Sequence, residues 1–177
     1  MTVFRAPATS ANIGAGFDTA AVAFDLWNEL EVTDGSGSTT TVTVEGEGSG
    51  ELPADGSNLA VQAYSLLADP GGKHFRFTNR IPLERGLGSS AAAITLGLVA
   101  AAPNASAEEL LGVGITLEPH ADNLAAALLG GLTLSWDGRI ARIAERLPLA
   151  AVAVVPRERT STESGSAVSR VLMTVLR

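Results

Sequence analysis

The chain has 177 residues, of which 46% are hydrophobic and 18% charged, and this composition excludes an intrinsically disordered protein. Its 12 Lys and Arg residues against 19 Asp and Glu residues give a formal net charge of −7. That balance argues against a nucleic-acid backbone as partner, because such binders need a cationic surface. The sequence has no cysteine, which excludes disulfides and thiolate metal sites.

Two further features predict a cytoplasmic protein. Met1–Arg5 leads directly into a patterned segment and lacks the basic and then apolar stretch of a signal peptide. The apolar run Ala91–Ala102 is too short to cross a bilayer.

The N-terminal third of the chain predicts strands and one long loop. Val3–Ala6 is typical of a short strand that runs into a loop, Pro7–Asp18, rich in Ala, Ser, Asn and Gly. Val22–Val32 is apolar enough for a long strand, and the alternating Thr and Val residues of Thr39–Glu45 indicate a hairpin partner.

The rest of the chain mixes helices with strands. A helix over Asn58–Ala68 would be capped near Ser57, and Ser106 would cap a helix with acidic residues in its first turn. The other predicted helices are Ser89–Ala102 and His120–Leu129, and the other predicted strands are His74–Asn79, Leu132–Trp136, Ile140–Ile143 and Leu149–Val155. This pattern predicts an α+β domain, with helices packed on one face of a mostly antiparallel sheet.

The first candidate site is the glycine- and serine-rich segment Gly86–Ala92, between a predicted strand and an Ala-rich helix. Glycines let the backbone approach a ligand, and the free amides at a helix start favour an anion. Ser89 and Ser90 add hydroxyls that could reach a phosphate oxygen or its metal. An ordinary glycine turn with a serine cap fits the same residues equally well. No lysine follows, which excludes a Walker-type loop, so Mg²⁺, amides or Arg85 would compensate the charge.

Two other segments carry polar groups that could bind a small ligand. Asn12 and Asp18 stand beside glycines in Pro7–Asp18, where turn chemistry alone also explains them. His120 and Asp122 open the predicted helix, and Asp122 could simply complement the helix dipole.

These segments, in this order, resemble the signatures of the GHMP small-molecule kinases, and within them those of the members that phosphorylate homoserine. Pro7–Asp18 is similar to the first signature, with Ala15 where proline is usual. Pro82–Ala92 matches the central ATP motif almost completely. The run His120–Asn123 resembles the His-x-Asp-Asn helix, and Ser161-Thr162-Glu163 resembles a Ser-Thr-Glu run that begins the second half.

The resemblance implies an N-terminal domain like the second domain of ribosomal protein S5, and transfer of phosphate from ATP·Mg²⁺ to the hydroxyl of L-homoserine, a step of threonine biosynthesis. Asn12, Asp18 and Arg85 would be catalytic, and Ser90 and Glu118 would hold the metal, with Glu109 as an alternative acid. The implied nucleotide contacts are Asn58, Pro82, Arg85, Gly86, Leu87, Gly88, Ser89, Ser90 and Ala91, and the implied substrate contacts are Asn12, Asp18, His120, Asp122 and Thr162.

The chain also departs from the family. Such kinases are about twice as long, so we expect residues 1–155 to form the N-terminal ATP-binding domain and 156–177 to be a remnant or start of the C-terminal substrate domain. An apolar face left uncovered would favour self-association, for example as a homodimer. Another small alcohol as acceptor, a nucleotide-binding fragment without activity, and an RNA-binding module remain alternatives, the last disfavoured by the charge.

Overall fold

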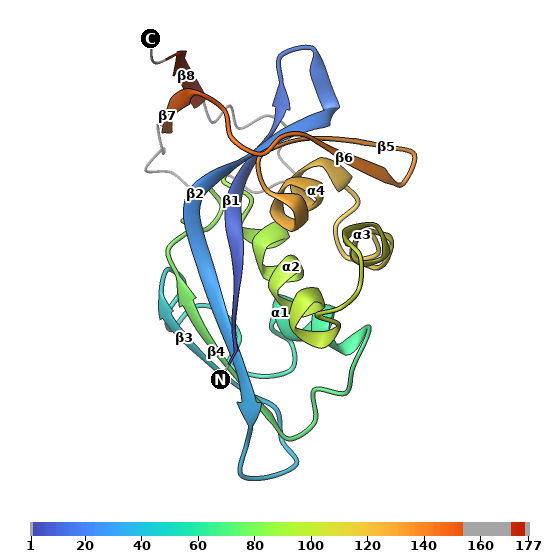
Figure 1. Ribbon diagram of the computed structural model, residues 1–177. Coiled ribbons are helices and arrows are strands. Elements are labelled where there is room, and N and C mark those ends of the chain that lie inside the picture. Colours follow the sequence, from blue (N-terminus) through green and yellow to red (C-terminus); the bar gives the residue numbers. More distant parts are fainter. Residues whose placement is uncertain (1, 154–170, 176–177) are drawn as a thin grey trace.

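The computed structural model describes residues 2–153 and 171–175. Within these residues lie eight strands and four helices (Figure 1). The strands are β1 (Val3–Ile13), β2 (Gly16–Asp34), β3 (Thr41–Gly46), β4 (Lys73–Asn79), β5 (Leu132–Trp136), β6 (Arg139–Ala144), β7 (Leu149–Ala153) and β8 (Val171–Val175), and the helices are α1 (Leu59–Ser65), α2 (Ser89–Ala101), α3 (Ala107–Gly114) and α4 (Ala121–Leu129).

The long strand β2 organises the main sheet, whose order is β3-β4-β2-β5-β6 with β1 also paired to β2. One end of β2 pairs with β4, where Leu30 faces Phe77, and the other end pairs with β5, where Ala20 faces Leu134. All pairs in this described sheet are antiparallel except β3 with β4. The expected α+β domain with a mostly antiparallel sheet is therefore confirmed.

The hairpin predicted for Thr39–Glu45 is wrong, although the segment does form a strand. β3 pairs in parallel with β4, so that Val42 faces Phe75. Helix α1 lies between these two strands in the chain, and a crossover of that kind is the connection that parallel neighbours require. Alternating Thr and Val residues indicate a strand but do not select its partner.

The loop predicted over Pro7–Asp18 is largely strand. β1 continues to Ile13 and β2 already begins at Gly16, so the two strands meet in a tight turn. The register shifts between Ala11 and Ile13 and again between Pro7 and Ala8. Propensity favours a loop for these small and polar residues, but the adjacent β2 supplies the hydrogen-bonding ladder that outweighs it.

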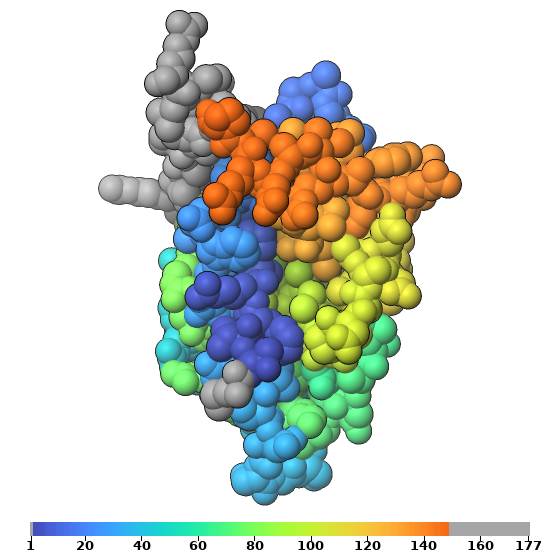
Figure 2. Space-filling model, in the orientation of Figure 1, coloured from blue at the N-terminus to red at the C-terminus, as the bar shows by residue number. Residues whose placement is uncertain are grey.

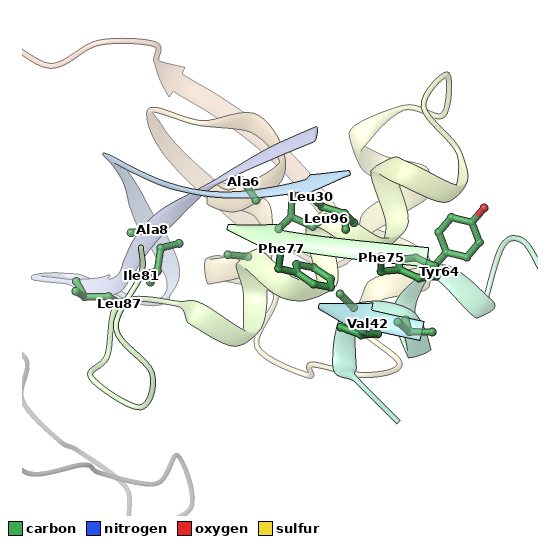
Figure 3. Close-up of a cluster of buried hydrophobic side chains, with 13 residues drawn as sticks. Ala6, Ala8, Leu30, Val42, Tyr64, Phe75, Phe77, Ile81, Leu87 and Leu96 are labelled. Carbon is green, nitrogen blue, oxygen red and sulfur yellow. The ribbon is translucent and has the colours of Figure 1, made fainter. Parts of the chain in front are cut away.

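The helices pack on one face of the sheet and enclose the core (Figures 1 and 3). Leu30 and Phe75 from the sheet meet Leu96 of α2 in one buried cluster, and the rings of Tyr64 in α1 and Phe75 pack in a T-shaped arrangement with centroids 5.1 Å apart. The two helices α1 and α2 touch closely, because a Cβ at Gly97 would lie 2.1 Å from the carbonyl oxygen of Ala60. Small residues thus let the helices approach.

The helix starts follow the capping rules only in part. Ser106 caps α3 through a complete capping box with Glu109, as expected. The cap of α1 is Asn58 rather than the neighbourhood of Ser57, because the Asn58 side chain accepts from the N–H of Ala60. Among the helices of the described residues, none is long and apolar enough to cross a membrane.

The turn between β1 and β2 stands at one end of the molecule, beside the segment of residues 130–148 (orange), whereas the β2–β3 loop stands at the other end (Figure 2). The pairing of β2 with β5 accounts for this neighbourhood. β7 pairs with β8 in a separate two-stranded sheet. The boundary expected at residues 155 and 156 lies outside the described residues and stays a prediction.

Candidate active site

The glycine turn before α2 leaves the start of this helix open. Gly86 and Gly88 both have φ of 68°, a left-handed conformation that suits glycine. Gly88 is the residue from which α2 begins, and no described side chain caps its N–H groups. Helices α1 and α3, in contrast, are each capped by a side chain. The first-turn amides of α2 are therefore available to an anion.

A pocket of about 290 Å³ adjoins this helix start. Ser89 and Ser90 line it from α2, and Asn58 lines it from the start of α1. Its other walls are mostly apolar, and they are formed by residues that include Leu52, Pro53, Leu59, Phe77, Leu83, Ala93 and Leu96. A mostly apolar cleft that ends at open amides suits a ligand with a flat apolar part and an anionic part.

The Asn58 side chain stabilises the backbone that surrounds this pocket. Its Oδ1 accepts from the N–H of Ala60 at 3.1 Å, and its Nδ2 donates to the carbonyl oxygen of Pro53 at 3.1 Å. The side chain, only 5% exposed, thus fixes both the helix start and the neighbouring backbone. Asn58 belongs to the wall of the pocket, and part of its hydrogen-bonding capacity is already used.

The turn between β1 and β2 carries two side chains on unusual backbone. Asn12 has φ of 59° and Asp18 has φ of 53°, both rare for residues other than glycine. The N–H of Asp18 donates to Oδ1 of Asn12 at 2.8 Å. Both residues are exposed. Backbone strain of this kind clusters at functional sites, and here it presents the Asp18 side chain to solvent from a fixed turn.

The start of α4 holds a small group of ionisable side chains. Nδ1 of His120 lies 2.9 Å from Oε1 of Glu118, and this hydrogen bond raises the pKa of His120. Burial raises the pKa of Asp122, which is 2% exposed. The negative charge of Asp18 raises the pKa of both His120 and Asp122 further. The β1–β2 turn and the start of α4 therefore lie within electrostatic range of one another.

Thr9, which the sequence does not single out, joins the three motifs. Its N–H donates to the carbonyl oxygen of Leu87 in the glycine turn at 3.0 Å, and its hydroxyl donates to Oδ1 of Asn123 in α4 at 2.8 Å. The residue is fully buried. Its position inside the first motif was the only available signal, because no spacing rule marks a threonine that bonds a residue so far along the chain.

The predicted metal ligands are not grouped in a recognisable way. Within the described ranges, no three His, Asp or Glu residues gather closely enough to hold a metal ion. Glu118 is engaged with His120, and Glu109 completes the capping box of α3. Glu109 is therefore better explained as a cap than as a metal ligand. Thr162 lies outside the described residues.

The remaining predicted residues of the ATP motif surround the glycine turn. Pro82 and Arg85 are half-buried at its entrance, and Leu87 and Ala91 are buried. A larger groove of about 850 Å³ lies along the middle of β2 and shares only Leu87 with the predicted site. Two of its polar side chains are engaged within the protein, because Asp25 accepts from the indole of Trp27 and Arg142 donates to the carbonyl oxygen of Leu129.

Comparison with known proteins shows which family the chain resembles. Residues 58–131, from the α1 cap to the start of β5, match the model of the GHMP kinases N terminal domain. The fold agrees, since the chain superposes on a homoserine kinase from Cytophaga hutchinsonii with a TM-score of 0.74 at 27% identity, covering 92% of this chain and 58% of that one. The family match and the shared fold together show that the chain is similar to the N-terminal domain of the GHMP kinases.

Within that family the similar sequences are homoserine kinases. One from Lactiplantibacillus plantarum is 39% identical over 166 residues, which cover 89% of this chain and 56% of the relative. One from Mycolicibacterium vanbaalenii is 43% identical over 177 residues, which cover 88% of this chain and 56% of the relative. A mevalonate kinase from Methanococcus jannaschii shares the fold, with a TM-score of 0.71, at 14% identity over 92% of this chain and 64% of that one. The chain spans about half the length of the curated relatives it matches.

Proposed function

We propose that the protein transfers the terminal phosphate of ATP to the hydroxyl of L-homoserine and forms O-phospho-L-homoserine. The observation that carries this proposal is the uncapped start of α2, which opens with Ser89 and Ser90 into the pocket of about 290 Å³. The homoserine kinase names of the relatives at 39–43% identity support this acceptor over another small alcohol. Mevalonate kinases support only the fold, given their low identity.

ATP fits the chemistry of this pocket. The adenine ring would lie against the apolar wall near Asn58, and the phosphates would bind the amides of Gly86–Ser90. Arg85 would add positive charge at the turn. Mg²⁺ would supply charge neutralisation, and Ser90 and Glu118 are the side chains we assign to it. Because the described residues offer no cluster of three acids, phosphate oxygens and water would complete the coordination.

The acceptor would bind between the β1–β2 turn and the start of α4. Asp18 and Asp122 give this region negative charge, which suits the ammonium group of an amino acid. Asn12 holds the backbone at Asp18, so the two residues would act as one unit that orients the acceptor hydroxyl. Thr162 would contribute from the segment that follows β7. Transfer then depends on placement and charge neutralisation more than on covalent chemistry.

The division of the chain follows from the same proposal. Residues 1–155 would form the ATP-binding domain, and 156–177 would be a remnant or the start of a C-terminal substrate domain. A role in threonine biosynthesis, a cytoplasmic location and self-association are parts of this proposal as well. Sedimentation analysis tests the last part, and a monomeric profile would contradict it.

The test of the function is release of ADP from ATP and Mg²⁺ with L-homoserine, measured against a control without acceptor. We expect acceptor-dependent release, and Asp18→Asn should raise the acceptor KM at least tenfold while leaving the KM for ATP within threefold. Nucleotide binding by calorimetry without any acceptor-dependent release would show a binding module instead of a kinase.

A further inference from the structure

Thr9 forms hydrogen bonds with two motifs that are remote in sequence, one through its backbone N–H and one through its hydroxyl. From the middle of β1, its N–H bonds the carbonyl oxygen of Leu87, and its hydroxyl bonds Oδ1 of Asn123. Thr9 itself is fully buried, so its hydroxyl is shielded from bulk solvent. One residue thus ties the glycine turn to α4.

The hydroxyl of Thr9 also fixes how closely the glycine turn packs. A Cβ at Gly88 would lie 1.9 Å from Oγ1 of Thr9 and 3.2 Å from its Cβ. Gly88 is the residue from which α2 begins. The first turn of α2, where the phosphates would bind, therefore rests directly on the Thr9 side chain.

On its other side the Thr9 contact leads to the acidic group of α4. The N–H of Asn123 donates to Oδ1 of Asp122 at 2.6 Å, and Nδ2 of Asn123 lies 3.4 Å from the same oxygen. The amide of Asn123 is therefore held between Thr9 and Asp122. Because Asp122 is nearly fully buried, its orientation depends on these few contacts.

We propose that Thr9 is a positioning residue that fixes the distance and orientation of the nucleotide-binding site relative to the acceptor-binding site. It touches neither ligand; it sets the separation between the glycine turn and the start of α4. The inference rests on the proposed function, in which the phosphates bind at that turn and the acceptor binds beside Asp122. A misplacement of about 1 Å can cost on the order of 10²-fold in rate, so the relative position of the two sites should determine turnover.

The experiment compares Thr9→Val, Thr9→Ser and Thr133→Val in the 177-residue chain. Valine cannot donate to Asn123 and puts a larger methyl group beside Gly88, whereas serine keeps the hydroxyl. Thr133 is the matched control, because it is fully buried on β5 and its hydroxyl donates to the carbonyl oxygen of Ala21 at 3.3 Å, and to neither the glycine turn nor α4. All measurements are made well below the melting temperature of each variant.

Calorimetry with a non-hydrolysable ATP analogue and Mg²⁺ should show affinity at least tenfold lower in Thr9→Val. Thr9→Ser and Thr133→Val should stay within threefold of the wild type. In the ADP-release assay, the kcat of Thr9→Val should be at least tenfold lower than that of the wild type. The acceptor KM should change less than threefold. If Thr9 were merely structural, its substitution would lower the melting temperature, as Thr133→Val should, without lowering nucleotide affinity and kcat in this way.

The possible failures are distinct. If the wild type binds no nucleotide, the proposed function fails and the role of Thr9 fails with it. If the wild type binds nucleotide but Thr9→Val binds it equally well, or if Thr133→Val loses as much affinity, only the role of Thr9 is overturned. Calorimetry separates these outcomes even when turnover of the chain is too slow to measure.

Discussion

Gly88 packs so tightly against Thr9 that a Cβ at position 88 would stand 1.9 Å from the threonine Oγ1. The same glycine has φ of 68°, which a side chain would strain. Position 88 therefore admits only glycine for two separate reasons, one steric and one conformational. Both act at the start of the helix that we assign to phosphate binding.

Gly88→Ala should destabilise the protein and weaken nucleotide binding. The left-handed conformation alone costs about 1–2 kcal/mol, and displacement of Thr9 adds to it. We expect a lower melting temperature in thermal denaturation and at least tenfold lower affinity in calorimetry. Gly112→Ala in α3 is the control, because nothing lies within 4 Å of its Cβ position; alanine there should stabilise the helix by about 0.5–1 kcal/mol. Equal effects of the two substitutions would argue against the tight contact at Gly88.

Ser90→Ala should lower turnover with Mg·ATP by on the order of tenfold or more. The hydroxyl lines the pocket at the open start of α2, and loss of one phosphate or metal contact is worth about 1.5–3 kcal/mol. Because Ser90 is exposed, the melting temperature should hardly change. Ser65→Ala is the control, since that hydroxyl bonds the carbonyl oxygen of Gln62 at the end of α1. Unchanged kinetics in Ser90→Ala would remove this serine from the site.

Protonation of His120 should be easier in the wild type than in Glu118→Gln. The hydrogen bond to Glu118 raises the pKa of His120, so the glutamine variant should titrate at lower pH when the imidazole is followed by NMR. A raised histidine pKa stabilises the fold fully below the unfolded pKa of about 6.5, and the stabilisation is lost as pH rises through the folded pKa. The wild type should therefore exceed Glu118→Gln in melting temperature mainly at acidic pH. An unchanged titration midpoint would contradict the contact.

Asp122→Asn should stabilise the protein at neutral pH while it impairs phosphoryl transfer. Burial raises the pKa of Asp122, so ionisation of this carboxylate costs folding free energy. The cost is absent below the unfolded pKa of about 3.9 and complete above the folded pKa, and the advantage of asparagine should grow over that range. We expect a rise in melting temperature on the order of 2–4 °C at neutral pH, corresponding to about 1 kcal/mol. A variant less stable than the wild type at neutral pH would show that the charge is better compensated than its burial implies.

Local chemistry in the sequence predicts the helices well. The capping box of Ser106 and Glu109 and the Ala-rich helix that starts at Ser89 are both present, because a cap and a run of helix formers act within a few residues. The pairing of the strands is harder to predict from the sequence. The alternation in Thr41–Gly46 does not reveal that its partner is β4, and the small residues of β1 conceal a strand. Pairing depends on neighbours that only the folded chain brings together.

The glycine turn, the adjacent Ser89 and Ser90, and the order of motifs that resembles the GHMP kinases can all be identified without a structure, since each is a short run whose chemistry is local. The folded structure was needed to show that the charge of Asp18 raises the pKa of both His120 and Asp122, and that Thr9 connects Leu87 to Asn123. The reason is physical: hydrogen bonds and electrostatic forces depend on distance in space, and positions 9 and 123 become neighbours only when β1 and α4 pack together.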